Sequence, residues 1–270
     1  MKHKLKILRI ITSIDPKFGG PAKTIIDGSL VLYNKGINVD VLTCDKEGSN
    51  FFKSKKIKII NKGPRFGTYG FSIRLFLWLF NNRDQYDAFI IHGIWQFITL
   101  AARILLKNKY YVFIHGQLDP FFAEDFLKLI KKKIYWFLVE KKNLQHSRSI
   151  LMTGLGEKET LKKTFVNTAG IKKEIIRYGI IKPKINKKKI LKKFFKKFPI
   201  LKNKVFYLFL GRFHEKKGCE IIIESVKKLK NNFKNIILFS GPMSGSKYEA
   251  KLINLVEKYN LRKKIIFTNA

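Results

Sequence analysis

Two cations, Arg212 and Lys217, lie in the segment whose composition points most directly to chemistry. An apolar, strand-like segment ends at Gly211, Arg212 follows at once, and Lys217 comes just before a helical pattern. The free N–H groups and the dipole of a helix N-terminus attract phosphate. Ligands of open α/β sheets bind outside the carboxyl ends of the strands. The sequence therefore predicts that Arg212 and Lys217 form a clamp for a diphosphate.

Three other predicted strand ends carry glycine beside a histidine or a second glycine. These pairs are Gly19-Gly20, His92-Gly93 and His115-Gly116. Adjacent glycines let the backbone approach a ligand closely, although they also form tight turns with no ligand. Histidines at the ends of two strands indicate either a site or two structural residues. No cluster of Cys, His and carboxylate residues has metal-ligand spacing, so we expect no metal.

The charge of the chain is strongly positive, with 56 Lys and Arg against 19 Asp and Glu and a net charge of +37. Such a charge favours nucleic acid, anionic lipid or nucleotide-linked substrates as partners. An AT-rich coding sequence, which favours lysine, is the alternative explanation. The lysines are spread along the chain and no nucleic-acid-binding module is recognisable, so we expect no nucleic acid partner.

The two cysteines, Cys44 and Cys219, are far apart, which fits a reducing, cytoplasmic compartment. The most apolar window, residues 71–80, is too short to cross a bilayer and contains Arg74. It is expected to form either a buried or an interfacial helix. A long basic helix is expected at residues 122–143. Its apolar residues face either the core or the inner surface of an anionic membrane, and we favour the core for Phe122, Phe126, Leu129, Ile130 and Phe137.

Alternating strand and helix patterns predict an α/β fold with parallel βαβ units in two Rossmann-like sections. The first section is residues 1–182, the second is residues 205–270, and a lysine-rich linker at 183–204, partly helical at 187–198, joins them. Strands are expected at 5–14, 38–43, 57–60, 88–92, 110–114, 149–153, 205–210, 236–240 and 264–268. Helices are expected at 22–34, 71–81, 97–106, 122–143, 157–165, 219–229 and 248–259. The second section contains half the strands of a doubly wound sheet, so we expect it to be incomplete.

Five segments, in order along the chain, carry a resemblance to a known family. They are Gly19-Gly-Pro-Ala22; Ile91-His-Gly-Ile-Trp95; His115-Gly-Gln-Leu-Asp-Pro120 with Lys131-Lys-Lys133; Thr153 with Glu157; and Gly211-Arg-Phe-His-Glu-Lys-Lys-Gly218 with Gly241-Pro242. With these segments the chain resembles the GT-B glycosyltransferases of family 4, also called group 1 glycosyltransferases. The resemblance implies two facing Rossmann-like domains.

The activity that the resemblance implies is the transfer of a sugar, with retention, from a nucleotide-sugar. The acceptor would be a glycan of the cell envelope, such as lipopolysaccharide or exopolysaccharide, or a lipid-linked molecule. The implied enzyme needs no cofactor and no metal, and lies in the cytoplasm, peripherally at the inner face of the membrane.

The resemblance also implies roles for matching residues. Arg212 and Lys217 would bind the donor diphosphate, and His115 would contact the transferred sugar as the catalytic residue. Backbone and loop contacts would come from Gly19, Gly20, Gly211 and Gly241. The acceptor side would include His92, Trp95 and Asp119. No nucleophile is assigned.

The sequence departs from the family in two places. Arg177-Tyr-Gly-Ile180 stands where the family usually has a Pro-Asn-Gly-Ile turn, and the chain ends before the family's Glu-x7-Glu segment. We therefore expect a chain truncated at its C-terminus, whose transferase activity is impaired. The alternatives are an inactive remnant and a basic protein that binds anionic membrane or nucleic acid.

Overall fold

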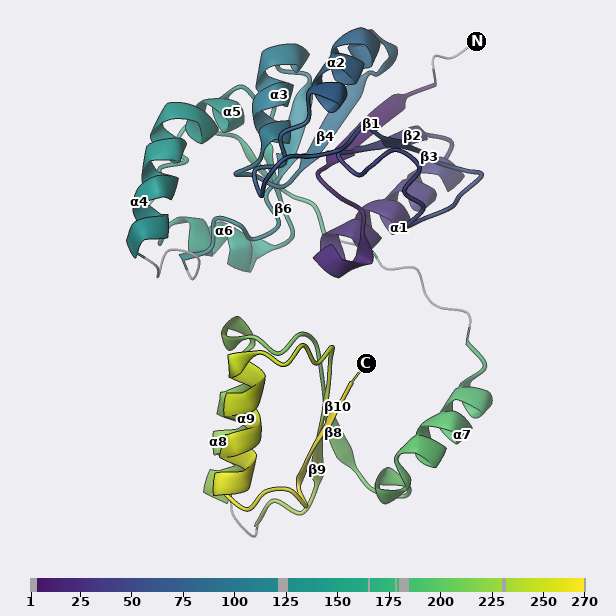
Figure 1. The fold of residues 1–270 in the computed structure, drawn as a ribbon, viewed down its shortest axis with the longest axis vertical. Helices are drawn as coiled ribbons and strands as arrows, with labels where there is room; N and C mark the ends of the chain where they lie inside the picture. The colour runs from purple at the N-terminus through teal and green to yellow at the C-terminus, as the bar shows by residue number, and fades with distance from the viewer. Residues whose placement is uncertain are drawn as a thin grey trace. The chain divides into compact units, whose positions relative to one another are not determined.

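The computed structural model describes residues 4–120, 126–164, 166–177, 179, 185–229 and 232–269 of the 270-residue chain. It divides into two compact units, Met1–Lys182 (unit 1) and Pro183–Ala270 (unit 2), each with an α/β fold (Figure 1). Among the described residues, no helix is long and apolar enough to cross a membrane. Four groups of residues used in the predictions lie outside this description: 122–125, Phe165, Tyr178 and 180–184.

Unit 1 contains a seven-stranded sheet with the order β3-β2-β1-β4-β5-β6-β7, and every neighbouring pair is parallel. Its strands are β1 (Lys6–Ile11), β2 (Asn38–Thr43), β3 (Lys58–Asn61), β4 (Ala88–His92), β5 (Tyr110–Phe113), β6 (Ile150–Met152) and β7 (Lys173–Ile175). Its helices include α1 (Gly20–Asn34), α2 (Ile73–Asn82), α3 (Phe97–Leu106), α4 (Phe126–Tyr135), the π-helix η4 (Trp136–Glu140), α5 (Lys141–Gln145) and α6 (Leu155–Leu161). These confirm the predicted α/β class, and β7 is an additional strand.

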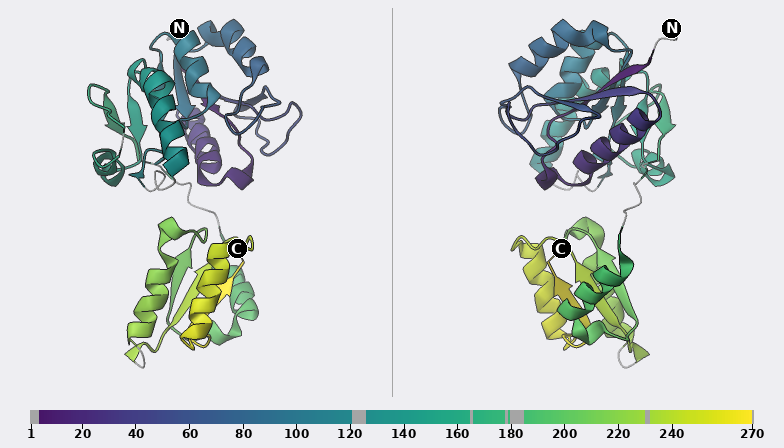
Figure 2. Two further views of the ribbon diagram at one scale, coloured as in Figure 1. Left: turned by 60° about the vertical axis from the view of Figure 1, so that its left-hand side comes forward. Right: turned by 90° about the vertical axis from the view of Figure 1, so that its right-hand side faces the viewer.

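Helices cover both faces of the unit 1 sheet, which explains the near-continuous apolar runs of its strands (Figure 2). Leu8, Ile10 and Ile91 belong to the larger of its two apolar clusters, together with residues of α2 and α3. The smaller cluster includes Ile25 of α1 and Val41 of β2. The central strands are therefore fixed by packing on both sides, and their carboxyl ends form a rigid edge.

The segment predicted as one basic helix at 122–143 is divided into α4, η4 and α5. Trp136 and Glu140 are buried, whereas Phe137 is 74% exposed and Ile130 is 39% exposed. The prediction that Ile130 and Phe137 face the core is therefore wrong. The apolar residues of this segment exceed what one buried face can hold, so some of them remain on the surface.

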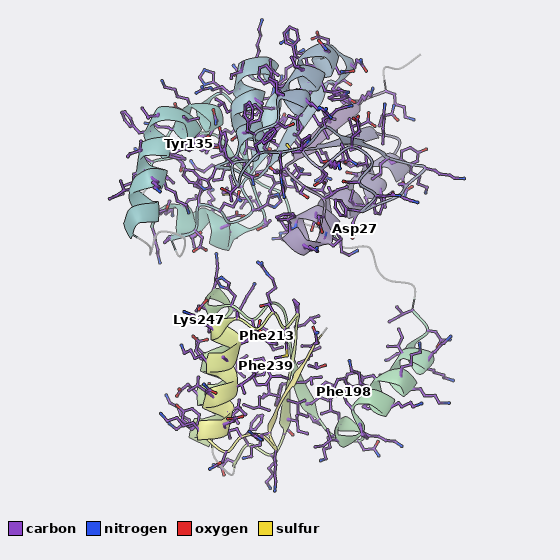
Figure 3. All side chains as sticks on the ribbon, in the orientation of Figure 1. Asp27, Tyr135, Phe198, Phe213, Phe239 and Lys247 are labelled. Carbon is purple, nitrogen blue, oxygen red and sulfur yellow. The ribbon has the colours of Figure 1, made fainter. Side chains whose placement is uncertain are left out.

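Unit 2 contains three parallel strands in the order β10-β9-β8. Its main elements are α7 (Lys187–Lys197), β8 (Phe206–Leu210), α8 (Cys219–Leu229), β9 (Ile236–Ser240), α9 (Lys247–Lys258) and β10 (Ile265–Thr268). Helices α8 and α9 lie on one face of the sheet and α7 on the other (Figure 2). Figure 3 shows Phe213 and Phe239 between the sheet and α9, where both belong to one apolar cluster.

Part of the predicted linker contributes to the core of unit 2. Asn186 caps α7 by accepting a hydrogen bond from the N–H of Lys189 at 3.1 Å. Phe194 of α7 packs against the buried residues Leu201 and Leu238. The lysine-rich face of α7 is exposed to solvent, and its phenylalanines cover the sheet. This is the usual arrangement of an amphipathic helix.

Candidate functional site

A pocket of about 370 Å³ lies at the carboxyl ends of β1, β4 and β5, and we call it the strand-end pocket. Its lining includes hydroxyl, amide, imidazole and guanidinium groups. These come from Thr12, Ser13, Thr68, Gln96, Gln117, His92, His115 and Arg65. Arg65 also stacks on the ring of Phe18, another lining residue, at 4.7 Å from its centroid. The pocket therefore offers many hydrogen-bonding groups and one permanent charge among its lining residues.

Strand register brings His92 and His115 together. His92 pairs with Ile11 of β1 and with Phe113 of β5, so these three side chains point to the same face of the sheet. Arg9 and His115 lie two residues from Ile11 and Phe113. The rings of His92 and His115 stack with centroids 5.3 Å apart, and Phe113 stacks on both.

The two histidines belong to a hydrogen-bond chain that begins at Arg9. Arg9 Nε donates to His92 Nε2 at 3.1 Å, and His92 Nδ1 lies 3.1 Å from His115 Nε2. Arg9 is only 7% exposed and His92 only 2%. Burial, and then the charge of Arg9, lower the pKa of His115 to about 4 and hold the pKa of His92 well below its ordinary value. Both rings are therefore neutral at pH 7.

Two glutamines fix the loop after β4. Gln96 Oε1 accepts from Thr12 Oγ1 at 2.6 Å, and Gln117 Oε1 accepts from the N–H of Ile94 at 2.7 Å. Gly93 has a φ of 105°, and a Cβ at this position would lie 3.2 Å from Gln96 Oε1. The positive φ and the close approach explain why glycine follows His92.

Glu157, which the family resemblance singled out with Thr153, ties two loops together. Its carboxylate accepts from the N–H of Gly116 at 2.5 Å and from the N–H and hydroxyl of Thr153 at 2.7 and 2.9 Å. His115 and Gly116 both have positive φ, 49° and 71°. Glu157 therefore stabilises the turn that presents His115.

The predicted glycine pair Gly19-Gly20 lies at the start of α1. Gly19 has a φ of 86°, and a Cβ there would meet no atom within 4 Å, so the backbone angle alone favours glycine. Both glycines line a second pocket of about 370 Å³, together with Lys23 and Asp27. Figure 3 labels Asp27 on this helix.

Trp95 and Asp119, predicted on the acceptor side, are not among the residues that line the strand-end pocket. Trp95 Nε1 donates to the carbonyl of Gln117 at 3.3 Å, and its ring packs near Tyr135 and Trp136. The N–H of Asp119 donates to the carbonyl of Gly116 at 3.1 Å. Trp95 therefore connects the loop that contains His115 and Gln117 to α4 and η4.

In unit 2, Arg212 and Lys217 lie on the loop Gly211–Gly218, which we call the cationic loop. Both side chains are exposed. Neither forms an ion pair or a side-chain hydrogen bond with any residue that the structure describes. Gly218, with a φ of 61°, leads directly into α8. Two cations that pair with no carboxylate among the described residues, beside the start of an eleven-residue helix, suit an anionic ligand.

The two predicted glycines of unit 2 meet through their backbones. The N–H of Gly211 donates to the carbonyl of Ser240 at 3.0 Å. A Cβ on Gly241 would lie 2.0 Å from the carbonyl oxygen of Gly211, which no side chain can tolerate. Gly241 is therefore required so that β8 and β9 can end side by side and place the cationic loop.

Sequence reasoning missed Arg9, Gln96 and Gln117. A charged residue inside an apolar strand was the available signal for Arg9, because a buried guanidinium requires acceptors. The described residues contain no group of three or more His, Cys, Asp or Glu side chains placed to hold a metal ion. The expectation of catalysis without a metal stays a prediction.

Comparisons with known proteins agree with this architecture. Residues 190–270 match the family model described as glycosyl transferases group 1. Sucrose-phosphate synthase from Thermosynechococcus elongatus is 17% identical with a TM-score of 0.68, and the match covers 98% of this chain and 70% of that one. HepE from Anabaena, in complex with UDP and glucose, is 14% identical with a TM-score of 0.63, covering 98% and 69%. WaaG, a glycosyltransferase involved in lipopolysaccharide biosynthesis, is 16% identical with a TM-score of 0.57, covering 98% and 70%.

None of the curated proteins matches this sequence. The family match over most of unit 2 and the shared fold over 98% of the chain confirm the resemblance to GT-B glycosyltransferases of group 1. Residues 190–270 therefore resemble the group 1 glycosyltransferases, and the chain as a whole shares their GT-B fold.

Proposed function

We propose that this protein binds a nucleotide-sugar through the cationic loop of unit 2 and transfers the sugar, with retention, to a hydroxyl-bearing acceptor. In the reaction, the bond between the anomeric carbon and the diphosphate oxygen breaks, a bond to the acceptor oxygen forms, and the proton of the acceptor hydroxyl passes to the departing diphosphate. Negative charge develops on the departing nucleoside diphosphate. Arg212 and Lys217 would stabilise that charge electrostatically.

The observation that carries this proposal is a pair of cations beside the start of α8 that form no ion pair with any described residue. Most exposed lysines of a basic protein lie in solvated surface positions. Arg212 and Lys217 differ because they flank a strand end and a helix N-terminus at once. The printed names of two structural neighbours fit the same ligand class, since HepE was solved with UDP and with UDP-glucose.

The strand-end pocket of unit 1 supports a sugar ligand. Thr12, Ser13 and Thr68 supply hydroxyl groups, and Gln96 and Gln117 supply amides. Sugars are recognised by such neutral donors and acceptors at fixed positions. His115, neutral at pH 7, would contact the transferred sugar as a hydrogen-bonding group rather than as a charged acid.

Calorimetric titration of the chain with UDP and GDP tests the donor site. We expect Arg212→Gln and Lys217→Gln each to weaken the binding about 10- to 100-fold, because each removes a charge-assisted hydrogen bond worth about 1.5–3 kcal/mol. Lys228→Gln is the matched control. Lys228 is an exposed lysine near the other end of α8, so its loss lowers the net charge by the same amount.

Equal weakening by all three substitutions would show that UDP responds to net charge alone, and would overturn the assignment of the cationic loop. Unchanged binding in both loop variants would overturn it as well. An in vitro assay with a UDP- or GDP-sugar and a lipid-linked glycan then tests transfer itself.

The acceptor class that we propose, a glycan of the cell envelope or a lipid-linked molecule, agrees with an exposed apolar stripe on unit 1. Ile130, Ile134, Phe137 and Leu138 are 39–74% exposed and recur at helical spacing along α4 and η4. Lys131 and Lys133 lie between them and are exposed too. Apolar side chains flanked by lysines favour peripheral contact with an anionic membrane.

Sedimentation with vesicles tests this contact. We expect binding to vesicles that contain phosphatidylglycerol, weaker binding to phosphatidylcholine alone, and a loss of binding in Phe137→Ser. Ile104→Ser on α3 removes another exposed apolar side chain, 53% exposed, and serves as the control. Equal binding by Phe137→Ser and the unaltered protein would contradict the membrane contact.

A further inference from the structure

The side chain of Arg9 is buried inside unit 1, where several hydrogen-bond acceptors surround it. Arg9 lies in the middle of β1 and is 7% exposed. Its Nη1 donates to the carbonyl of Ile25 at 3.1 Å and to Ser29 Oγ at 3.3 Å, while its Nε donates to His92 Nε2. The hydroxyl of Ser29 donates in turn to the carbonyl of Ile25 at 2.7 Å, so its oxygen is left to accept from Arg9.

Helix α1 is shaped to admit this guanidinium. Gly28 lies inside α1, and a Cβ at that position would come within 2.9 Å of Arg9 Nη1. Glycine inside a helix costs about 1 kcal/mol relative to alanine. A buried arginine is also unfavourable unless acceptors surround it. Two unfavourable choices at one place indicate that Arg9 has a purpose beyond packing.

The hydrogen-bond chain from Arg9 has a fixed direction. A guanidinium can only donate, because arginine stays protonated at all ordinary pH values. His92 Nε2 must therefore accept, which places the His92 proton on Nδ1. That Nδ1–H donates to His115 Nε2, 3.1 Å away, so His115 must carry its own proton on Nδ1.

We propose that Arg9 is a positioning residue that, through His92, fixes His115 as the neutral tautomer protonated on Nδ1. His115 lines the strand-end pocket. In this tautomer its Nδ1 is a hydrogen-bond donor and not an acceptor. The group it suits is an acceptor oxygen, such as a sugar hydroxyl. This role of His115 rests on the proposed glycosyl transfer, whereas the tautomer itself does not.

The electrostatics of the cluster agree with this direction. Protonation of His92 would place an N–H against the guanidinium of Arg9, 3.1 Å away. Burial first, and then the charge of Arg9, lower the pKa of both rings, and His115 further lowers that of His92. Both imidazole rings therefore stay neutral at pH 7, Arg9 keeps its positive charge, and the donor direction is kept.

Long-range ¹H–¹⁵N correlation spectra of the histidine rings in the ¹⁵N-labelled chain test the proposal at pH 7. We expect His92 and His115 both to show a protonated Nδ1 and an unprotonated Nε2. A His115 ring protonated on Nε2 in the unaltered protein would overturn the proposal without any variant.

Arg9→Met and Arg9→Lys supply the second comparison. Methionine fills much of the space but cannot donate, so His92 and His115 should become tautomer mixtures that titrate closer to the ordinary pKa of about 6.5. Lysine keeps a donor and should preserve the Nδ1–H form of both rings. Arg74→Met, at an exposed arginine of α2, should change nothing. A folded Arg9→Met protein that keeps the original tautomer would overturn the proposal.

The spectra test the tautomer of His115 and the UDP titration tests the donor site, so either claim can be wrong while the other stands. If UDP does not bind to the cationic loop while both rings keep Nδ1–H, the proposed function is wrong and the tautomer stands. If the tautomer differs while the loop variants lose UDP, the inference about Arg9 is wrong and the donor site stands.

Discussion

The candidate groups of unit 1 and unit 2 differ in how they are held. In unit 1, His92 is buried and His115 is half-buried, and both are neutral members of a hydrogen-bond chain that starts at Arg9. In unit 2, Arg212 and Lys217 are exposed, and the described residues give them no ion pair. Unit 1 fixes proton positions in advance, while unit 2 leaves two charges available to a ligand.

The difference fits two kinds of recognition. A neutral sugar is distinguished by the direction of each hydrogen bond, which requires side chains that cannot turn or change protonation state. A diphosphate is attracted by charge over a longer range and tolerates flexible lysine and arginine side chains. The carboxyl edge of a parallel sheet therefore suits both kinds of recognition. The burial of the side chains decides which kind of ligand each edge suits.

Gly241→Ala should produce the largest effect and tests how unit 2 places its charges. The added methyl would overlap the carbonyl oxygen of Gly211, 2.0 Å away, so the strand ends must separate. We expect a loss of about 3 kcal/mol or more of stability in unit 2, as for severe overpacking, and loss of UDP binding. Thermal unfolding and the UDP titration measure both.

Gly211→Ala is the matched control for this substitution. A Cβ on Gly211 would meet only the Phe209 ring at 3.6 Å, an ordinary contact. If Gly211→Ala and Gly241→Ala had equal effects, backbone contact between the two strand ends would not be what places the cationic loop.

Two buried glutamates should respond to pH in opposite directions. Burial raises the pKa of Glu140 in unit 1 to about 7 from 4.5, so the folded protein keeps a proton that the unfolded chain releases. Its contribution to stability is complete below pH 4.5 and is lost as the pH rises to about 7, a change of about 3 kcal/mol. Glu140→Gln should therefore be more stable than the unaltered protein at pH 8, and this advantage should disappear at pH 4.5.

Glu249 in unit 2 is the opposite case. Burial opposes its ionisation, but hydrogen bonds from Ser244, Gly245 and Ser246 outweigh burial and lower its pKa below 4.5. Its contribution is present above pH 4.5 and is lost as the pH falls further. Urea unfolding of Glu140→Gln and Glu249→Gln between pH 4 and 8 measures both trends, and parallel curves would contradict the contrast between the units.

Glu157→Gln should have a smaller effect, confined to unit 1. An amide NH₂ cannot accept, so the substitution breaks the hydrogen bond from either Gly116 or Thr153. We expect a loss of about 1 kcal/mol, the usual net contribution of one hydrogen bond, because these groups are only half-buried. The NMR signals of His115 should shift, while UDP binding to unit 2 stays the same. Glu159→Gln, which removes an exposed partner of Lys162, should leave both unchanged.

Most elements were predicted within a few residues because apolar periodicity and glycine positions mark them locally. The bounds of β2, β4, α3, α8 and β9 were predicted without error. The short strand β7 was missed, because Lys173–Ile175 has no apolar run and owes its form to pairing with β6. The π-helical segment η4 was missed as well, since no periodicity distinguishes it from an α-helix.

The sequence by itself determined the α/β class, the strand ends that carry the candidate groups, and the glycines that let the backbone turn there. These features depend on residues adjacent in the chain. Only the tertiary structure decided that Arg9 reaches His92, 83 positions away, and that Gly211 meets Gly241. Parallel pairing sets both contacts, because the register between distant strands decides which side chains share a face and which backbones touch.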